Sequence, residues 1–156
     1  MRISFDLDDT LIPDKTQMPI EEALPPLRRG YIEERLRRGA RELMTTLHKR
    51  GVEIWIYTNS MRGKQNLLAW FAACEIPISN VINEQLHEVE LGKRGLLPRA
   101  CPVKCPHFFG IDLHVDDSKQ VEDDGLAHGF QVLRVAPDDP GWVETVLSRV
   151  DAMLQG

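Results

Sequence analysis

Residues 3–11 read Ile-Ser-Phe-Asp-Leu-Asp-Asp-Thr-Leu, a short apolar run that breaks into carboxylates. Its length and its apolar positions Ile3, Phe5 and Leu7 favour a buried strand over a helix. Because Asp is disfavoured within strands, we expect the strand to end near Asp6, with its acids at the carboxyl end. In open α/β sheets, that edge is where ligands bind. A plain turn after the strand is the alternative, since Asp is also common in turns.

Three carboxylates, those of Asp6, Asp8 and Asp9, follow closely on one another at the end of this run. Like charges so near each other repel, so we expect a metal ion or a shared proton between them. Residues 6–11 resemble the first motif of the haloacid dehalogenase-like hydrolases, Asp-x-Asp-x-Thr/Val. The resemblance implies that Asp6 is the nucleophile and Asp8 the general acid/base. An Asp carboxylate can form an acyl-phosphate, and a second carboxyl of raised pKa can protonate the leaving oxygen.

A second apolar run covers residues 52–57, Val-Glu-Ile-Trp-Ile-Tyr, and is typical of a central strand. It ends in Thr58, Asn59 and Ser60, which resembles the second motif of the same family, an apolar strand closing on Thr or Ser. The hydroxyl of Thr58, with neighbouring backbone N–H groups, can hold a phosphoryl oxygen. The alternative is that Thr58 or Ser60 caps the next helix. Asn59 and Arg62 are further candidates for contacting the substrate.

A third apolar run, residues 111–115, leads into Asp116 and Asp117. This resembles the fourth motif of the family, which supplies metal-binding acids. The resemblance implies a Mg²⁺ ion held by Asp6, by the backbone carbonyl of Asp8 and by Asp116, with Asp117 bound directly or through water. Mg²⁺ prefers a few carboxylates together with waters and phosphate oxygens. A helix cap at the end of this run is the alternative.

The third motif of the family is a lysine shortly before the last acidic strand, and both Lys93 and Lys104 qualify. We favour Lys104, because compact, deoxyribonucleotidase-like members keep this lysine close ahead of the acidic pair. Its charge would offset the negative charge of the nucleophile and the phosphate. A lysine that is merely solvated or held in a salt bridge is the alternative.

A dense basic run lies between residues 28 and 41 and consists of Arg28, Arg29, Arg35, Arg37, Arg38 and Arg41. We interpret it as a solvated helix face paired with neighbouring glutamates, Glu33, Glu34 and Glu42. In the alternative interpretation, one or two of these arginines reach over the site and hold an anionic substrate.

Two further groups carry chemistry of their own. His87 follows a short strand and could lie near the site, although a lone His is more often structural. Cys101, Cys105 and His107 could in principle bind zinc, but their spacing is not one of the usual zinc patterns.

The chain has 156 residues, of which 42% are hydrophobic and 28% charged, as expected for one soluble globular domain. The net charge of −5 argues mildly against an obligate nucleic-acid ligand, yet leaves room for a local basic patch. No stretch reaches the ~18 uninterrupted apolar residues of a membrane span. The amino-terminal segment is typical of a core strand and not of a signal sequence. Three cysteines cannot all pair with one another, so we expect a cytoplasmic protein.

The remaining patterns predict helices over residues 40–49, 63–74 and 142–154, and strands near 81–82 and over 130–135. They predict a loop over 91–106 and irregular backbone over 12–26 with a short helix near 20–24. The acidic run at 122–124 is interpreted as solvated surface. Strands that alternate with helices predict a parallel sheet with helices on both faces. We therefore expect residues 1–156 to form a single Rossmann-like three-layer α/β/α domain. The resemblance implies a haloacid dehalogenase-like domain in which residues 11–38 form a small flap and not a full cap.

The resemblance as a whole implies a magnesium-dependent phosphatase that hydrolyses a phosphomonoester through an aspartyl-phosphate on Asp6. A phosphotransferase with the same intermediate and a non-catalytic phosphate- or protein-binding module are the alternatives. Since open sites in this family often serve bulky phosphates, the substrate is either a phosphorylated small molecule or an exposed macromolecular phosphate. The sequence leaves the oligomeric state open.

Overall fold

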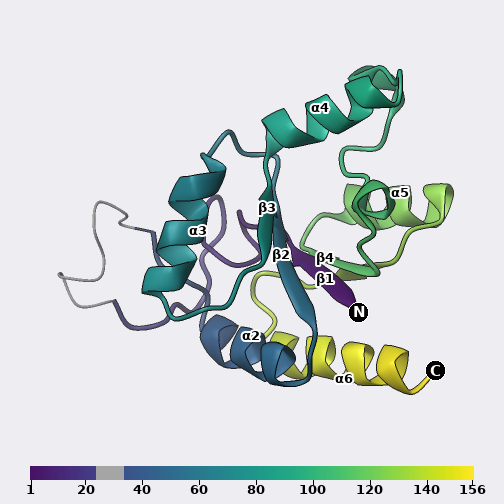
Figure 1. Ribbon diagram of the computed structural model, residues 1–156. Coiled ribbons are helices and arrows are strands. Elements are labelled where there is room, and N and C mark those ends of the chain that lie inside the picture. The colour runs from purple at the N-terminus through teal and green to yellow at the C-terminus, as the bar shows by residue number, and fades with distance from the viewer. Residues whose placement is uncertain (24–33) are drawn as a thin grey trace.

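The computed structural model describes residues 1–23 and 34–156. In this part of the chain, five strands form one sheet in the order β3-β2-β1-β4-β5, and each neighbouring pair is parallel (Figure 1). The strands are β1 (Arg2–Phe5), β2 (Glu53–Tyr57), β3 (Asn80–Ile82), β4 (Leu113–Asp116) and β5 (Val132–Arg134). This is the predicted Rossmann-like α/β architecture, with β1 at the centre of the sheet.

Helices cover both faces of the sheet, so the molecule has three layers (Figure 1). The helices are α2 (Ala40–Lys49), α3 (Lys64–Ala73), α4 (Glu84–Lys93), α5 (Lys119–His128) and α6 (Trp142–Gln155), with short 3₁₀ turns η1 (Pro98–Ala100) and η2 (Pro106–Phe109). Helices α2, α3 and α6 pack on one face, while α4 and α5 lie on the other. Right-handed crossovers between parallel strands produce this arrangement. From β1 through β2 to β3 the chain moves towards one edge of the sheet, and it then crosses to β4 and β5 on the other side of β1. The helices that connect the second set of strands therefore lie on the opposite face. No helix in the described residues is long and apolar enough to span a membrane.

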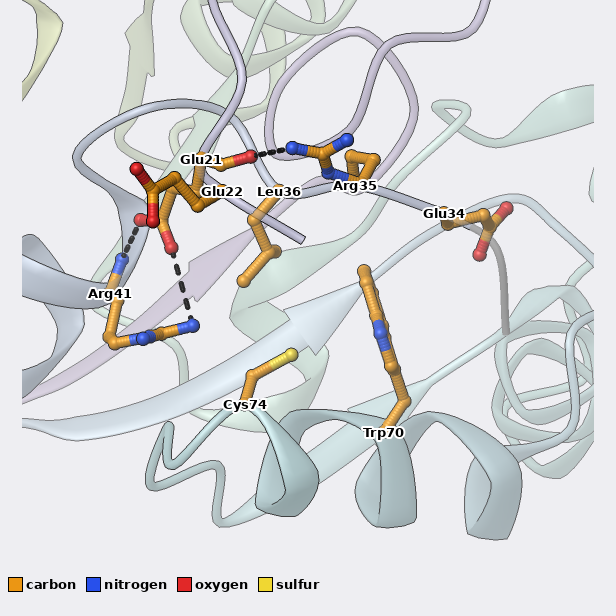
Figure 2. A pocket seen from close by; sticks show the side chains of 8 residues that line it. All are labelled: Glu21, Glu22, Glu34, Arg35, Leu36, Arg41, Trp70 and Cys74. Atoms are coloured by element: carbon orange, nitrogen blue, oxygen red, sulfur yellow. Dashed lines mark hydrogen bonds and ion pairs between the residues drawn. The ribbon is translucent and has the colours of Figure 1, made fainter. Parts of the chain in front are cut away.

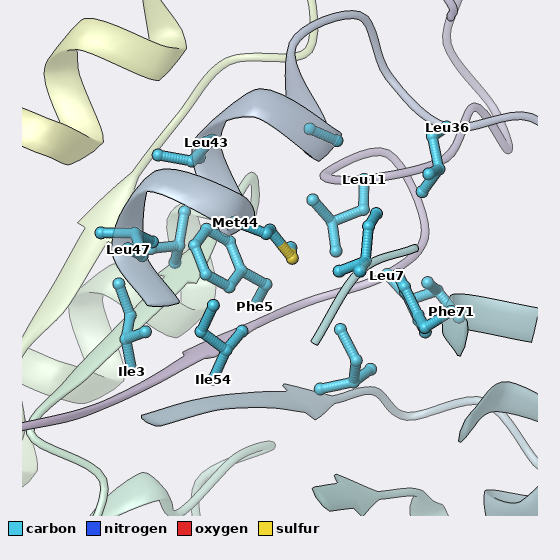
Figure 3. Packing of buried hydrophobic residues seen from close by; sticks show 14 of the residues in the cluster. Ile3, Phe5, Leu7, Leu11, Leu36, Leu43, Met44, Leu47, Ile54 and Phe71 are labelled. Carbon is cyan, nitrogen blue, oxygen red and sulfur yellow. The ribbon is translucent and has the colours of Figure 1, made fainter. Parts of the chain in front are cut away.

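The side chains of β1 alternate between the two faces of the sheet. Ile3 and Phe5 are fully buried on the α2 side, where they pack with Leu43 and Leu47 (Figure 3). Burying each such side chain contributes about 1.5–3 kcal/mol relative to leaving it exposed. Ser4, between them, points to the other face and is also fully buried. A slip of β1 by one residue would turn Ile3 and Phe5 away from this core, so the alternation fixes the register of the strand and with it the position of Asp6 at the edge of the sheet.

Two helices were not predicted, and both carry only a narrow apolar stripe. Helix α4 begins after Asn83, whose side chain accepts a hydrogen bond from the Leu86 N–H at 3.0 Å. Only His87 and Leu91, one turn apart, are buried within it. Helix α5 contains the acids that we expected on a solvated surface, and of its residues only Val121 and Gly125 are buried. Such mostly exposed helices leave little hydrophobic periodicity to detect.

The region before α2 differs from its prediction in two ways. Residues 20–23 form no helix, and Ile20 instead forms an isolated antiparallel bridge with Arg37; residue 24, the end of the predicted helix, lies outside the described residues. Arg35, Arg37 and Arg38 precede α2, so the prediction of a helix face for these arginines is wrong. Arg28, Arg29 and Glu33 lie outside the described residues.

Candidate active site

The carboxyl ends of β1, β2 and β4 meet at one edge of the sheet, around an open pocket of about 300 Å³. The residues that line this pocket are Asp6, Asp8, Asp14, Lys15, Thr58, Asn59, Ser60, Val103, Lys104, Asp116, Asp117, Ser118 and Val121. Parallel strands bring their carboxyl ends together, and this is why segments more than 100 residues apart share the pocket.

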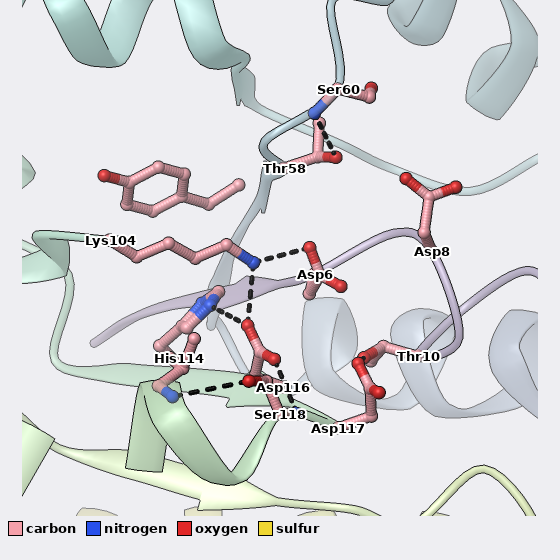
Figure 4. Close-up of polar contacts among 12 residues, drawn as sticks. Asp6, Asp8, Thr10, Thr58, Ser60, Lys104, His114, Asp116, Asp117 and Ser118 are labelled. Atoms are coloured by element: carbon pink, nitrogen blue, oxygen red, sulfur yellow. Dashed lines mark hydrogen bonds and ion pairs between the residues drawn. The ribbon is translucent and has the colours of Figure 1, made fainter. Parts of the chain in front are cut away.

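Lys104 joins the two innermost carboxylates of the pocket (Figure 4). Its ammonium Nζ lies 2.5 Å from Asp6 Oδ1 and 2.7 Å from Asp116 Oδ2. The Lys104 side chain is only 3% exposed. Lys93, the other candidate, lies at the end of α4, is 68% exposed and pairs with Glu90. The structure therefore brings Lys104, and not Lys93, to Asp6.

Burial and charge act in opposite directions on these groups. Burial, followed by the charge of Asp116, raises the pKa of Asp6 to about 7, although Lys104 lowers it. Burial also favours the neutral form of Asp116, but Lys104 and a hydrogen bond from His114 hold its pKa well below the usual range. Burial opposes the charged form of Lys104, yet the two carboxylates raise its pKa. The pocket thus contains a Lys104–Asp116 ion pair, whose charged forms stabilise each other, beside a second carboxyl, that of Asp6, which burial makes harder to ionise.

A third carboxylate, that of Asp117, completes an acidic cluster. Carboxylate oxygens of Asp6, Asp116 and Asp117 lie within 4.8 Å of one another. Asp117 accepts a hydrogen bond from the Thr10 hydroxyl at 3.2 Å, and burial and the charge of Asp116 raise its pKa. Three carboxylates against one lysine leave an excess of negative charge, and hard oxygen ligands suit a divalent cation such as Mg²⁺. Among the described residues, this is the one group of three or more His, Cys, Asp or Glu side chains that could hold a metal ion.

The residues after β2 form a turn at the rim of the pocket. Thr58 is buried, and its hydroxyl oxygen accepts a hydrogen bond from the Ser60 N–H at 3.1 Å. The Thr58 hydroxyl proton stays available for an acceptor in the pocket. Helix α3 starts later, and its N-cap residue is Gly63, so Thr58 and Ser60 do not cap it. Asn59 is exposed and lines the pocket.

Arg62 contacts a pocket residue without lining the pocket itself. Its Nη1 lies 3.0 Å from Asp8 Oδ2, and its Nε donates to Glu34 Oε1 at 3.1 Å. The guanidinium is therefore clamped between two carboxylates. It holds the Asp8 side chain in place, which a sequence motif alone does not reveal.

The other candidates lie away from the acidic cluster. His87 is buried in α4, where its Nδ1 lies 2.5 Å from the Tyr57 hydroxyl, and it does not line the pocket. Within residues 1–23 and 34–156, Cys101, Cys105 and His107 form no metal-binding group. The ring of His107 instead stacks on that of Phe130.

The described arginines of the basic run do not line this pocket. Arg35 and Arg41 border a separate small cavity of about 20 Å³ beside Cys74 (Figure 2). Arg35 donates to the backbone carbonyl of Glu21, and Arg41 pairs with the Glu21 carboxylate at 3.6 Å. These arginines stabilise the chain before α2, and the interpretation that they hold a substrate is not supported for the described members of the run.

Sequence reasoning missed His114, whose imidazole touches the cluster. His114 lies in β4, within the run 111–115 that is predicted as an apolar strand, and its Nε2 is 2.9 Å from Asp116 Oδ2. Burial and then the charge of Lys104 lower the pKa of His114, which favours the neutral form of the ring. The available signal was the spacing, because residues two apart in a strand share a face. A His two positions before an acid at a strand end is therefore placed to contact it.

Comparisons with known proteins support the fold. The chain is similar to a chain in a structure of the Pnkp1/Rnl/Hen1 RNA repair complex, with a TM-score of 0.52 and 14% identity over 88% of this chain and 42% of that one. A second structure of the Pnkp1/Rnl/Hen1 complex gives a TM-score of 0.52 and 13% identity over 88% of this chain and 46% of that one. The hypothetical protein PH1952 from Pyrococcus horikoshii OT3 gives a TM-score of 0.38 and 16% identity over 85% of this chain and 40% of that one.

The chain thus spans less than half the length of these solved structures. No protein-family model matches it, and no curated protein matches its sequence significantly. At 13–14% identity, the likeness to the two RNA repair structures shows a shared α/β fold alone.

Proposed function

We propose that the protein is a haloacid dehalogenase-like phosphatase that hydrolyses a phosphomonoester with the help of Mg²⁺. One observation carries this proposal: Asp6, Asp116 and Asp117 present carboxylate oxygens within 4.8 Å of one another, with Lys104 bonded to two of them, in an open pocket. A plain turn after β1 has no need for this convergence, and burying several like charges is costly unless a ligand uses them.

In the proposed reaction, a carboxylate oxygen of Asp6 attacks phosphorus, and the bond from phosphorus to the ester oxygen breaks. Asp8 gives its proton to that leaving oxygen. Asp8 then takes a proton from a water molecule that attacks the aspartyl-phosphate, which releases inorganic phosphate and regenerates Asp6. Thr58 donates a hydrogen bond to a phosphoryl oxygen, and Lys104 offsets the charge that gathers on the transferring group.

The carboxylates of Asp6, Asp116 and Asp117 fit the metal, and the backbone carbonyl of Asp8 is the fourth ligand that we propose. When bound, Mg²⁺ would neutralise charge on the phosphoryl group and orient it. Arg62 orients Asp8 in this scheme, because it is already bonded to that carboxylate at 3.0 Å.

The proposal is tested by turnover of an aryl phosphate with Mg²⁺. We expect Asp6→Asn to lower kcat by about 10³-fold or more, because an amide is not a nucleophile of comparable strength. Asp112→Asn is the matched control, since Asp112 lies before the amino end of β4 and bonds the backbone of Arg2. Removal of divalent cations with a chelator should abolish turnover and Mg²⁺ should restore it. Equal rates for wild type and Asp6→Asn would contradict the proposal.

Because the pocket is open, an alcohol could replace water as the acceptor of the phosphoryl group. If an alcohol reaches the aspartyl-phosphate in place of water, the protein is a phosphotransferase, and added acceptor alcohols would yield a new phosphate ester. A binding module without catalysis would instead bind phosphate, and hydrolysis of the aryl phosphate would proceed at the same background rate with wild type and with Asp6→Asn.

We further propose that the open pocket accepts a bulky or macromolecular phosphate. The two solved structures of similar fold belong to an RNA repair complex, so a polynucleotide end is one substrate to include. Phosphorylated metabolites, nucleotides, phosphopeptides and phosphorylated oligonucleotides should therefore be compared in one screen by kcat/KM.

A further inference from the structure

A buried chain of hydrogen bonds leads from the middle of β1 to the carboxylate of Asp116. Ser4 Oγ lies 2.7 Å from His114 Nδ1. His114 Nε2 in turn lies 2.9 Å from Asp116 Oδ2 (Figure 4). Ser4 and His114 face each other across the β1–β4 ladder, and neither is exposed. The strand register therefore determines this contact, because a slip by one residue would turn the imidazole to the opposite face of the sheet.

The chemistry of the partners fixes the direction of each hydrogen bond. An ionised carboxylate can only accept, so His114 Nε2 must carry a hydrogen and donate it to Asp116. A neutral ring then has a lone pair on Nδ1, which accepts a hydrogen bond from the Ser4 hydroxyl. The Asp116 carboxylate thus requires the Nε2–H tautomer of His114, and the hydrogen bond between Ser4 and Nδ1 anchors the other side of the ring.

Three donors together leave the Asp116 carboxylate little freedom to turn. Its Oδ2 accepts from His114 and from Lys104, at 2.9 Å and 2.7 Å. Its Oδ1 accepts from the Ser118 N–H at 2.9 Å. Each carboxylate oxygen has about two acceptor sites, so one site on Oδ1 remains for a ligand in the pocket.

Stability alone does not account for the polar pair. On its own face of the sheet, the His114 ring packs against the buried ring of Tyr57, with 5.6 Å between the two ring centroids. Replacing both partners of a buried hydrogen bond by apolar groups of similar shape is often nearly neutral for stability. The effect of the Ser4–His114 pair instead falls on the orientation of Asp116, the carboxylate that His114 contacts.

We propose that Ser4 and His114 are positioning residues that orient Asp116 and so raise the affinity of the Asp6–Asp116–Asp117 cluster for Mg²⁺. This inference rests on the proposed function, which supplies the metal. Hydrogen-bond partners of metal ligands commonly contribute a factor of 10–100 to metal affinity, because they hold the ligand in its binding orientation.

The test measures Mg²⁺ binding directly, by isothermal titration calorimetry of the full chain with MgCl₂ and without substrate. We expect His114→Phe to raise the Kd for Mg²⁺ by about 10-fold or more, and Ser4→Ala to raise it by more than about twofold. His87→Phe is the matched control. His87 is also buried on this face, yet in the described residues it bonds Tyr57 and none of the three carboxylates, so its Kd should stay within about twofold of wild type.

A second readout does not depend on the metal. The ¹⁵N chemical shifts of the His114 ring in wild type should show hydrogen on Nε2 and none on Nδ1. Hydrogen on Nδ1 alone would overturn the proposal, because Nε2 could not then donate to Asp116.

The outcomes separate this inference from the proposed function. If wild type binds no Mg²⁺, both fail. If wild type binds Mg²⁺ and either Ser4→Ala or folded His114→Phe keeps the wild-type Kd, the positioning pair is wrong while the proposed function stands. Should His114→Phe not fold, Ser4→Ala decides the matter, because it removes a single oxygen atom.

Discussion

Asp9 shapes the turn that carries two pocket residues. Its backbone has a φ of 59°, in the left-handed region. Its carboxylate accepts hydrogen bonds from the backbone N–H groups of Asp14, Lys15 and Thr16, at 3.0–3.1 Å, and from the Thr16 hydroxyl at 2.7 Å. Burial favours its neutral form, but these donors together lower the pKa of Asp9 below 3.8. The third acid of the first motif is therefore a structural residue that places Asp14 and Lys15 at the pocket.

We expect Asp9→Ala to destabilise the fold by about 1–3 kcal/mol at pH 7, because several N–H donors lose their acceptor. A carboxyl whose folded pKa is lowered stabilises the protein above its unfolded pKa, and this contribution is lost as the pH falls through the folded pKa. The difference between wild type and Asp9→Ala in urea unfolding should thus be constant near neutral pH and shrink below about pH 4.

Asp9→Asn serves as the control for that experiment. Asn tolerates the left-handed backbone and keeps one acceptor oxygen, so its loss of stability should be smaller and should depend less on pH. An equal loss at pH 3 and pH 7 for Asp9→Ala would show that the carboxylate charge has no part in the turn.

Individual residues differ in how far the sequence predicts them. Asp6, Asp116 and Thr58 follow apolar strands directly, so their meeting at one sheet edge follows from a local pattern. The contact of Ser4 with His114 and the clamp of Arg62 between Asp8 and Glu34 do not. Those contacts join residues far apart in the chain, and no local spacing encodes them.

At the scale of elements, α5 shows why some helices escape prediction. Its buried Gly125 lies where the helix meets the chain that enters β5. A Cβ atom there would stand 2.8 Å from the backbone oxygen of Phe130 and 2.8 Å from Val132 Cγ2. The close approach requires glycine in mid-helix, which weakens the helical signal of the sequence.

We expect Gly125→Ala to lower the free energy of unfolding by about 1 kcal/mol or more, since the strain of overpacking exceeds the roughly 1 kcal/mol gained in helix propensity. Gly92→Ala in α4 is the matched control. A Cβ at Gly92 meets nothing within 4 Å, so alanine there should stabilise the protein by up to about 1 kcal/mol. Chemical denaturation measures the change in the free energy of unfolding for both variants. Changes of opposite sign would support the packing of α5 on β5, and a stabilising Gly125→Ala would contradict it.

Across the whole molecule, Arg37 ties together three segments that are distant in sequence. Its guanidinium donates to the backbone oxygens of Thr10, Ala136 and Asp139, at 3.4, 2.7 and 2.9 Å. It also lies over the ring of Trp142, with its central carbon 4.5 Å from the ring centroid. The loop after β1, the turn after β5 and the start of α6 are thereby held in one arrangement.

We expect Arg37→Met to destabilise the protein by about 3 kcal/mol or more, because three carbonyl groups lose a charged donor inside the protein. Arg38→Met, which alters the exposed neighbour in the same basic run, should change stability by less than about 0.5 kcal/mol. Both values come from urea unfolding monitored by circular dichroism. Equal small effects would restore the interpretation of this run as a solvated surface.

The sequence by itself determined the alternation of strands and helices, the acids and the hydroxyl at the strand ends, and hence the edge at which a site forms. It did so because side-chain period and strand termination are local properties of the chain. The tertiary structure alone decided that Lys104 and not Lys93 reaches Asp6, that Arg37 is buried, and that Ser4 and His114 stand behind Asp116. These contacts depend on strand order and register, which are set by the packing of the whole core, and that information is spread over residues distant from one another.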